Sequence, residues 1–245
     1  SRSGIISDFA LKEARRTAPE AHFRQEYECE FLAGAGAVFR RVEDNVEGEF
    51  ERPVAGRRYV MGVDLAKHVD FTVLTVIDKT THRVVYWDRF NEINYSLQKA
   101  KIESVAARYN NALVRVDSTG VGDPIVEDLI RGDVRCEPFI FTNKTKAELI
   151  ENLLIMIDEG KVKYPKIPEL LQELNSFTFK ELGSGKIRYE APDSGHDDCV
   201  MSLALACYRL GKKEEPNLTV GGNSRDYVRY LEGGGVGWKP EVKFM

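Results

Sequence analysis

The order of strands and helices between residues 59 and 160 restricts this 245-residue chain to few folds. Three runs rich in β-branched and aromatic residues follow one another with short joints, at 59–65, 71–78 and 84–90. Such runs predict an antiparallel meander. Helices and strands then alternate, in the order helix 96–109, strand 112–117, helix 123–132, strand 136–142 and helix 146–160. This order predicts an α/β fold with a mixed five-stranded sheet and helices on both faces.

Local signals mark several element ends. Asp123 precedes Pro124, which is typical of an N-cap followed by the first helical residue. Residues 176–192 contain two short strands around a Gly-Ser-Gly turn and predict an added β-hairpin. Residues 195–213 predict a final helix, for which Asp197 or Asp198 is the expected cap.

Three parts of the chain differ in composition. Residues 1–56 are charged and mostly helical in pattern, and we interpret them as an N-terminal arm or linker. Residues 57–212 contain the α/β pattern and are expected to form the main domain. Residues 213–245 are rich in glycine and predict a flexible tail that orders only against a partner.

Charge and cysteine content exclude some classes of protein. The net charge is -4 and the sequence pI is about 5.7, so no overall positive field would hold nucleic acid. Contacts with nucleic acid must then come from local basic patches or bound cations. Four scattered cysteines without a C-x-x-C pair indicate reduced thiols in a cytosolic setting. No apolar run approaches the roughly 18 residues of a membrane span, so we expect a soluble protein without membrane contact.

Acidic residues stand at three informative points of the pattern. Asp64 is near the end of the first strand, Asp117 ends the fourth strand, and Asp197 and Asp198 open the final helix. If the first and fourth strands are parallel neighbours, Asp64 and Asp117 emerge at the same edge of the sheet. A buried carboxylate without a partner costs several kcal/mol or more, so these groups need a cation.

Oxygen ligands without His or Cys spacing are typical of Mg²⁺ or Mn²⁺. Two such ions can clamp the attacking and leaving oxygens of a phosphoryl displacement. Taken singly, each aspartate is more typical of a turn or a helix cap. Together, the four predict a site that holds two divalent cations.

Other residues are weaker candidates. Asp70 is a further candidate metal ligand, although its place at a strand start explains it about as well. His196 is a candidate donor to the metal-binding carboxylates, and Lys67 a candidate contact to a phosphate. In the hairpin, Lys186 and Arg188 share one strand face, and Lys180 on the partner strand adds a third charge, which predicts a contact with DNA phosphates.

Resemblance to a known family rests on four segments: GVDLAKHVDFTVLTVID, VRVDSTGVGDPIVEDL, ELGSGKIRYEAP and GHDDCVMSLALA. Together they resemble the nuclease domain of the large terminase of tailed bacteriophages, the DNA-packaging motor, over roughly residues 23–210. The resemblance implies a ribonuclease H-like fold and metal-dependent endonucleolytic cutting of double-stranded DNA concatemers. It matches Asp64 and Asp117 to metal ligands and leaves open which of Asp197 and Asp198 is the third.

The resemblance also implies partners. These are double-stranded DNA, an ATPase motor domain in cis, the portal and the small terminase subunit, at the procapsid in the host cytoplasm. The segment FRQEYECEFL resembles the point where such proteins leave the motor, and no Walker A motif is present, so an excised domain is expected.

Three alternatives remain. A Holliday-junction resolvase or transposase-type nuclease would share the fold and the carboxylates but act on another substrate. A sugar-kinase or actin-like ATPase would need glycine-rich phosphate loops after the first strand, and DLAKHVD has none. A non-catalytic DNA-clamping module would bind DNA without metal-dependent cleavage.

Overall fold

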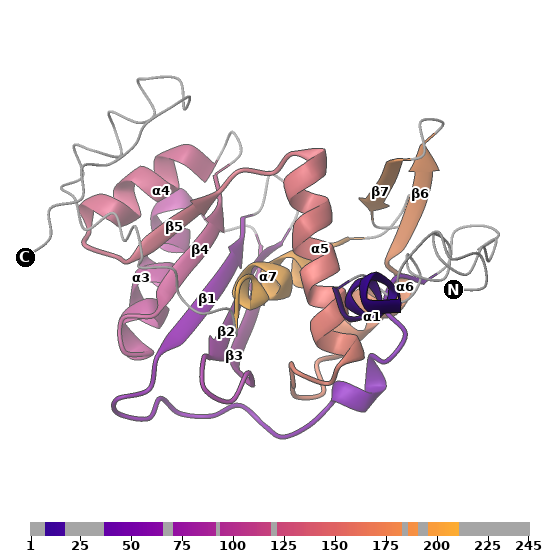
Figure 1. Ribbon diagram of the computed structural model, residues 1–245. Helices are drawn as coiled ribbons and strands as arrows, with labels where there is room; N and C mark the ends of the chain where they lie inside the picture. Colours follow the sequence, from indigo (N-terminus) through magenta and orange to yellow (C-terminus); the bar gives the residue numbers. More distant parts are fainter. Residues whose placement is uncertain are drawn as a thin grey trace, which may run out of the picture.

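A five-stranded sheet forms the centre of the molecule (Figure 1). The computed structural model describes residues 8–17, 37–65, 71–91, 94–118, 122–182, 186–190 and 196–210. The strand order is β3-β2-β1-β4-β5. The strands are β1 (Tyr59–Asp64), β2 (Thr72–Asp78), β3 (Val84–Phe90), β4 (Leu113–Asp117) and β5 (Cys136–Phe139).

Strand pairing confirms the predicted mixed sheet. Strands β1, β2 and β3 pair antiparallel as a meander. Strand β4 returns parallel to β1, and β5 continues parallel to β4. The first and fourth strands are therefore central neighbours that end at the same edge.

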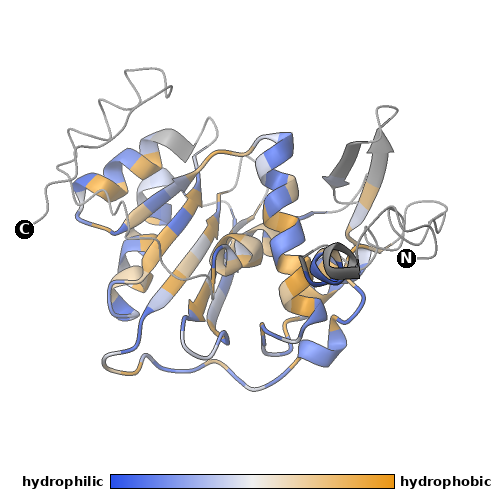
Figure 2. Cartoon of the chain, viewed as in Figure 1, coloured by the Kyte–Doolittle hydropathy of each residue, from blue (hydrophilic) through white to orange (hydrophobic). Residues whose placement is uncertain are grey.

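Helices cover both faces of the sheet (Figure 1). Helices α3 and α4 cover one face, and α7 lies directly on the other, with α5 and α6 packed against it. Hydrophobic residues concentrate in the strands and in α7, while polar residues line the outer helix surfaces (Figure 2). The helices are α1 (Asp8–Thr17), the short 3-10 helix η1 (Glu43–Asn45), α3 (Tyr95–Arg108), α4 (Gly122–Arg131), α5 (Asn143–Asp158), α6 (Pro168–Ser176) and α7 (Asp198–Cys207).

The helices differ in several places from those predicted. Helix α4 begins at Gly122, so Asp123 lies in its first turn and is not the N-cap. Helix α5 begins at Asn143 instead of 146, because Thr142 and Thr145 form a reciprocal capping box. Helix α6, which has Pro168 in its first turn, was not predicted.

The predicted hairpin is present. It consists of β6 (Thr178–Leu182) and β7 (Lys186–Glu190), which pair antiparallel with Lys180 opposite Arg188. It stands apart from the main sheet (Figure 1). On β7, Tyr189 is buried in the same core cluster as α5 and α7, so one face of the hairpin is anchored to the domain.

Part of the segment interpreted as an arm packs into the domain. Val38, Phe39 and Val42 are buried, and the ring of Phe39 lies 5.7 Å from that of Phe177. The Tyr164 hydroxyl donates to the Val42 carbonyl at 2.9 Å. Residues 37–42 therefore contribute side chains to the core beside α5 and α6.

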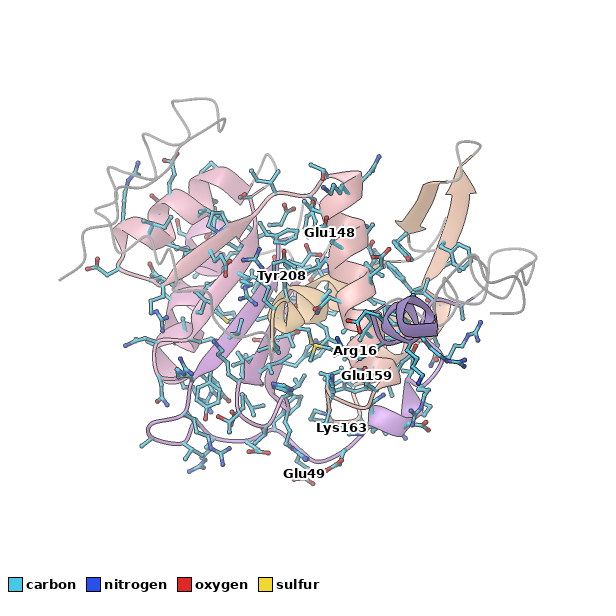
Figure 3. The ribbon with its side chains drawn as sticks, viewed as in Figure 1. Arg16, Glu49, Glu148, Glu159, Lys163 and Tyr208 are labelled. Atoms are coloured by element: carbon cyan, nitrogen blue, oxygen red, sulfur yellow. The ribbon has the colours of Figure 1, made fainter. Side chains whose placement is uncertain are left out.

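The carboxyl end of α7 is tied to the sheet. Tyr208 follows the helix (Figure 3), and its carbonyl accepts a hydrogen bond from the guanidinium of Arg115 on β4. Its ring lies 5.3 Å from that of Phe139 on β5.

Within the described part of the chain, none of the helices has the length and apolar character to cross a membrane. Expectations for residues 18–36 and for the tail at 213–245 concern residues outside the described ranges.

Candidate active site

The central parallel strands bring Asp64 and Asp117 together. Their register pairs Gly62 with Arg115 and Val63 with Val116, and one further step sets Asp64 beside Asp117. Side chains two residues apart share a face of a strand, so both aspartates lie on the face that α7 covers. Asp117 is only 6% exposed and Asp64 is partly buried.

Gly62 allows α7 to lie directly on β1. A Cβ at this position would stand 2.0 Å from the Ser202 carbonyl oxygen and 2.5 Å from the Ala206 nitrogen, both backbone atoms. The Ser202 hydroxyl hydrogen-bonds the Gly62 carbonyl at 3.0 Å and lies 2.8 Å from Thr75 Oγ1. Close packing of the helix on the strand delivers the amino end of α7 to the edge where β1 and β4 end.

That amino end supplies two more carboxylates. Asp197 occupies the N-cap position of α7 but makes no side-chain capping hydrogen bond. Asp198 is 8% exposed, and its Oδ2 accepts from the Phe71 backbone N–H at 3.4 Å. We call Asp64, Asp117, Asp197 and Asp198 the acidic edge.

The charges of the acidic edge act on Asp64. Burial raises the pKa of Asp64 well above its ordinary value, and the charges of Asp198, Asp197 and Asp117 raise it further. Among the described residues, no three acidic, His or Cys side chains stand close enough to hold one ion as they are. The donor set is nevertheless all carboxylate oxygen, which is the ligand type that Mg²⁺ and Mn²⁺ prefer.

Lys146 is a site residue that the sequence analysis missed. Its Nζ lies 2.8 Å from Asp197 Oδ2, and both side chains are less than one-third exposed. Its charge also lowers the pKa of Asp64, in opposition to the three aspartates. The only available signal was its position in the first turn after a Thr142 cap, which places it at the amino end of α5, next to that of α7.

Glu173 of α6 is a second missed residue. Its Oε2 accepts from the Cys199 backbone N–H at 2.8 Å and from that of Val200 at 3.3 Å. Burial raises the pKa of Glu173, while hydrogen bonds from Cys199 and Val200 and the charge of Arg89 oppose that rise. The carboxylate of Glu173 on α6 therefore accepts hydrogen bonds from the backbone N–H groups in the first turn of α7.

The other predicted residues have different outcomes. His196 lies beside Asp198, with Nδ1 3.8 Å from Oδ2, beyond hydrogen-bond distance, and its ring stands edge-on to Phe71. Lys67 and Asp70 lie outside the described residues. For the hairpin positions 180, 186 and 188, the structure describes the backbone pairing alone.

Fold and site together define the class. A meander followed by parallel strands, with carboxylates where the two central strands end and at the start of a covering helix, is a ribonuclease H-like domain. The added hairpin immediately before the covering helix distinguishes this domain within the class.

Comparisons with known proteins identify the family. The family described as Terminase RNaseH-like domain matches residues 61–209. The large terminase subunit of Thermus virus P23-45 is 34% identical over 206 residues, which make up 79% of this chain and 42% of that protein. The corresponding subunit of Thermus phage G20c is 33% identical over 206 residues, with the same coverage.

A solved structure agrees with these sequence matches. The crystal structure of the large terminase nuclease from thermophilic phage G20c with bound magnesium has a TM-score of 0.66 and 30% identity. That match covers 71% of this chain and 97% of the solved one. The chain belongs to the terminase ribonuclease H-like family, and its fold is that of the nuclease domain of a phage large terminase subunit.

The chain corresponds to part of its relatives, since it spans less than half the length of the curated relatives that it matches. Family membership also favours the terminase over the resolvase and actin-like alternatives.

Proposed function

We propose that this chain is a two-metal-ion endonuclease domain that cuts double-stranded viral DNA concatemers during genome packaging. The observation that carries the proposal is the acidic edge, where Asp64 shares its electrostatic environment with three other aspartates. Such a group of carboxylates is unfavourable without a cation, because like charges repel in a partly desolvated site.

The donor set supports divalent ions as the cofactor. Crystal structures of the G20c large terminase nuclease with bound magnesium and with bound cobalt, each 30% identical to this chain, support the same conclusion. We propose Asp64, Asp117, Asp197 and Asp198 as metal ligands, with Asp70 as a further candidate. When bound, the ions would activate the attacking water and stabilise the leaving oxygen at the scissile phosphate.

The chain's own residues orient this chemistry. The sheet fixes Asp64 and Asp117, whose backbones are held in the strand ladder. The packing of α7 on Gly62 and the Phe71 N–H fix Asp198, and Asp197 forms an ion pair with Lys146 that metal binding would replace. We propose that His196 and Lys67 act beside the metal ligands, as a support for a carboxylate and as a phosphate contact.

The remaining proposals concern the whole protein. Residues 1–56, of which 37–42 pack into the core, would link the domain to an ATPase motor in cis, 57–212 would be the nuclease, and 213–245 a tail. The partners would be double-stranded DNA, the portal and the small terminase subunit, at the procapsid in the host cytoplasm. The greater length of the curated relatives supports a further domain in the full protein.

A plasmid-nicking assay with Mn²⁺, Mg²⁺ or chelator tests the proposal. We expect cleavage with Mn²⁺, loss of cleavage in chelator, and loss of cleavage in Asp64→Ala with the variant still folded by circular dichroism. Saturating Mn²⁺ should also stabilise the wild-type domain, by about 2.7 kcal/mol at a hundredfold excess over Kd for one site. DNA binding without any metal-dependent cleavage would instead indicate a clamping module.

A further inference from the structure

The first turn of α7 is capped from outside the helix. Helix α7 begins at Asp198, so Cys199 and Val200 are its second and third residues. Their N–H groups are the ones that the side chain of an N-cap residue ordinarily accepts. In this structure both donate to one oxygen of Glu173, which is 7% exposed on α6.

Because Glu173 caps α7, Asp197 is not needed as the cap of that helix. An N-cap aspartate gains about 1 kcal/mol by turning back onto its own helix, which would direct its carboxylate away from the acidic edge. Asp197 makes no such bond. Its carboxylate instead pairs with Lys146 across the helix interface at 2.8 Å.

We propose that Glu173 is a positioning residue for the metal site: it caps α7 in place of Asp197 and so keeps Asp197 and Asp198 available to the acidic edge. The inference rests on the proposed metal-binding function. Glu173 acts through the orientation of the two aspartates and does not itself bind metal or DNA. This role requires a side chain long enough to bring an acceptor oxygen to the N–H groups of Cys199 and Val200. It does not require a charge.

Three variants of the whole chain separate this role from general support of the fold. Glu173→Leu removes the acceptor, and Glu173→Asp shortens its reach and serves if the leucine variant does not fold. Glu173→Gln keeps an acceptor oxygen at the same length. The control is Tyr164→Phe, which loses the buried hydrogen bond to the Val42 carbonyl and leaves the amino end of α7 unchanged.

Mn²⁺ binding is then measured by calorimetry and by the shift in melting temperature. Loss of an outer support of a metal ligand typically weakens metal affinity about 10- to 100-fold, so we expect at least about tenfold weaker Mn²⁺ binding in Glu173→Leu or Glu173→Asp. Glu173→Gln should bind Mn²⁺ like the wild type, and Tyr164→Phe should melt at a lower temperature with unchanged Mn²⁺ affinity.

Two results would overturn the inference. One is wild-type Mn²⁺ affinity in both Glu173→Leu and Glu173→Asp, and the other is an equal loss of affinity in Tyr164→Phe. If wild-type protein itself binds no Mn²⁺, the proposed metal site fails first, so the two failures are distinguishable.

Discussion

Asp64 has an unfavourable electrostatic environment for its charged form. Burial and three neighbouring aspartates raise its pKa, and Lys146 only partly opposes them. A raised pKa means that the folded domain binds a proton more tightly than the unfolded chain does. In the absence of metal, Asp64 therefore costs stability as pH rises from the ordinary Asp pKa through the raised value.

Asp64→Asn should remove that cost. In chelator at pH 7, we expect the variant to melt at a higher temperature than the wild type. The difference should shrink as pH falls toward the ordinary Asp pKa of about 4, below which the wild-type carboxyl becomes protonated in both states. Melting curves between pH 4 and 8 measure this, with Asp44→Asn, an exposed carboxylate paired with Arg41, as the control. An equal or lower melting temperature for Asp64→Asn at pH 7 would show that the repulsion is not significant.

Lys146 competes with metal for Asp197. Lys146→Met removes the cation while keeping the length of the side chain. Since a partly exposed ion pair contributes about 1 kcal/mol, we expect Mn²⁺ to half-saturate the variant at roughly a fivefold lower concentration. Thermal-shift titration measures this. The control, Lys144→Met, removes a lysine whose side chain is 83% exposed on the same helix. Weaker Mn²⁺ binding in Lys146→Met would show that the lysine supports the metal site instead.

At the scale of elements, the contact between β1 and α7 determines the geometry of the site. Gly62→Ala would place a methyl group against two backbone atoms that belong to one helix, and neither can move alone. Overpacking typically costs 1–3 kcal/mol, so we expect a loss of stability of about that size or more. Denaturant unfolding measures it. Gly132→Ala is the control, because its new Cβ would meet the movable end of Glu103. A Gly62→Ala variant as stable as the wild type would show that α7 has room to shift.

The sequence predicted those parts of the site that follow from local pattern. The meander and the alternation after it predicted a mixed sheet in which the first and fourth strands can be neighbours, and the pairing of β1 with β4 brings Asp64 beside Asp117. Lys146 and Glu173 were missed because their partners lie 51 and 26 residues away along the chain. Glu173 also lies on α6, a helix that was not predicted. A glutamate in a helix is usually on the solvent-exposed face, and the burial of Glu173 against α7 depends on tertiary packing alone.

At the scale of the whole molecule, an acidic domain must hold DNA through a local surface. The net charge is -4, so nonspecific attraction to phosphates is weak overall. In the hairpin, Lys180 is paired with Arg188, and Lys186 lies two residues before Arg188 on the same strand, so the three positions share one face. Tyr189 on the opposite face is buried in the core.

The hairpin directly precedes α7 in the chain, so we infer that it guides duplex DNA toward the acidic edge through phosphate contacts. Replacing Lys186 and Arg188 together by Gln should weaken binding to all sequences alike. Loss of two phosphate contacts should flatten the dependence of log K on log salt by about two units. The matched control replaces Arg41 and Lys161 by Gln, which removes the same charge near the carboxyl end of α5, away from the acidic edge. Fluorescence anisotropy across a salt series compares the two variants, and cleavage by both should persist at saturating DNA. If they show the same salt dependence, net charge alone accounts for binding and the hairpin is not the guide.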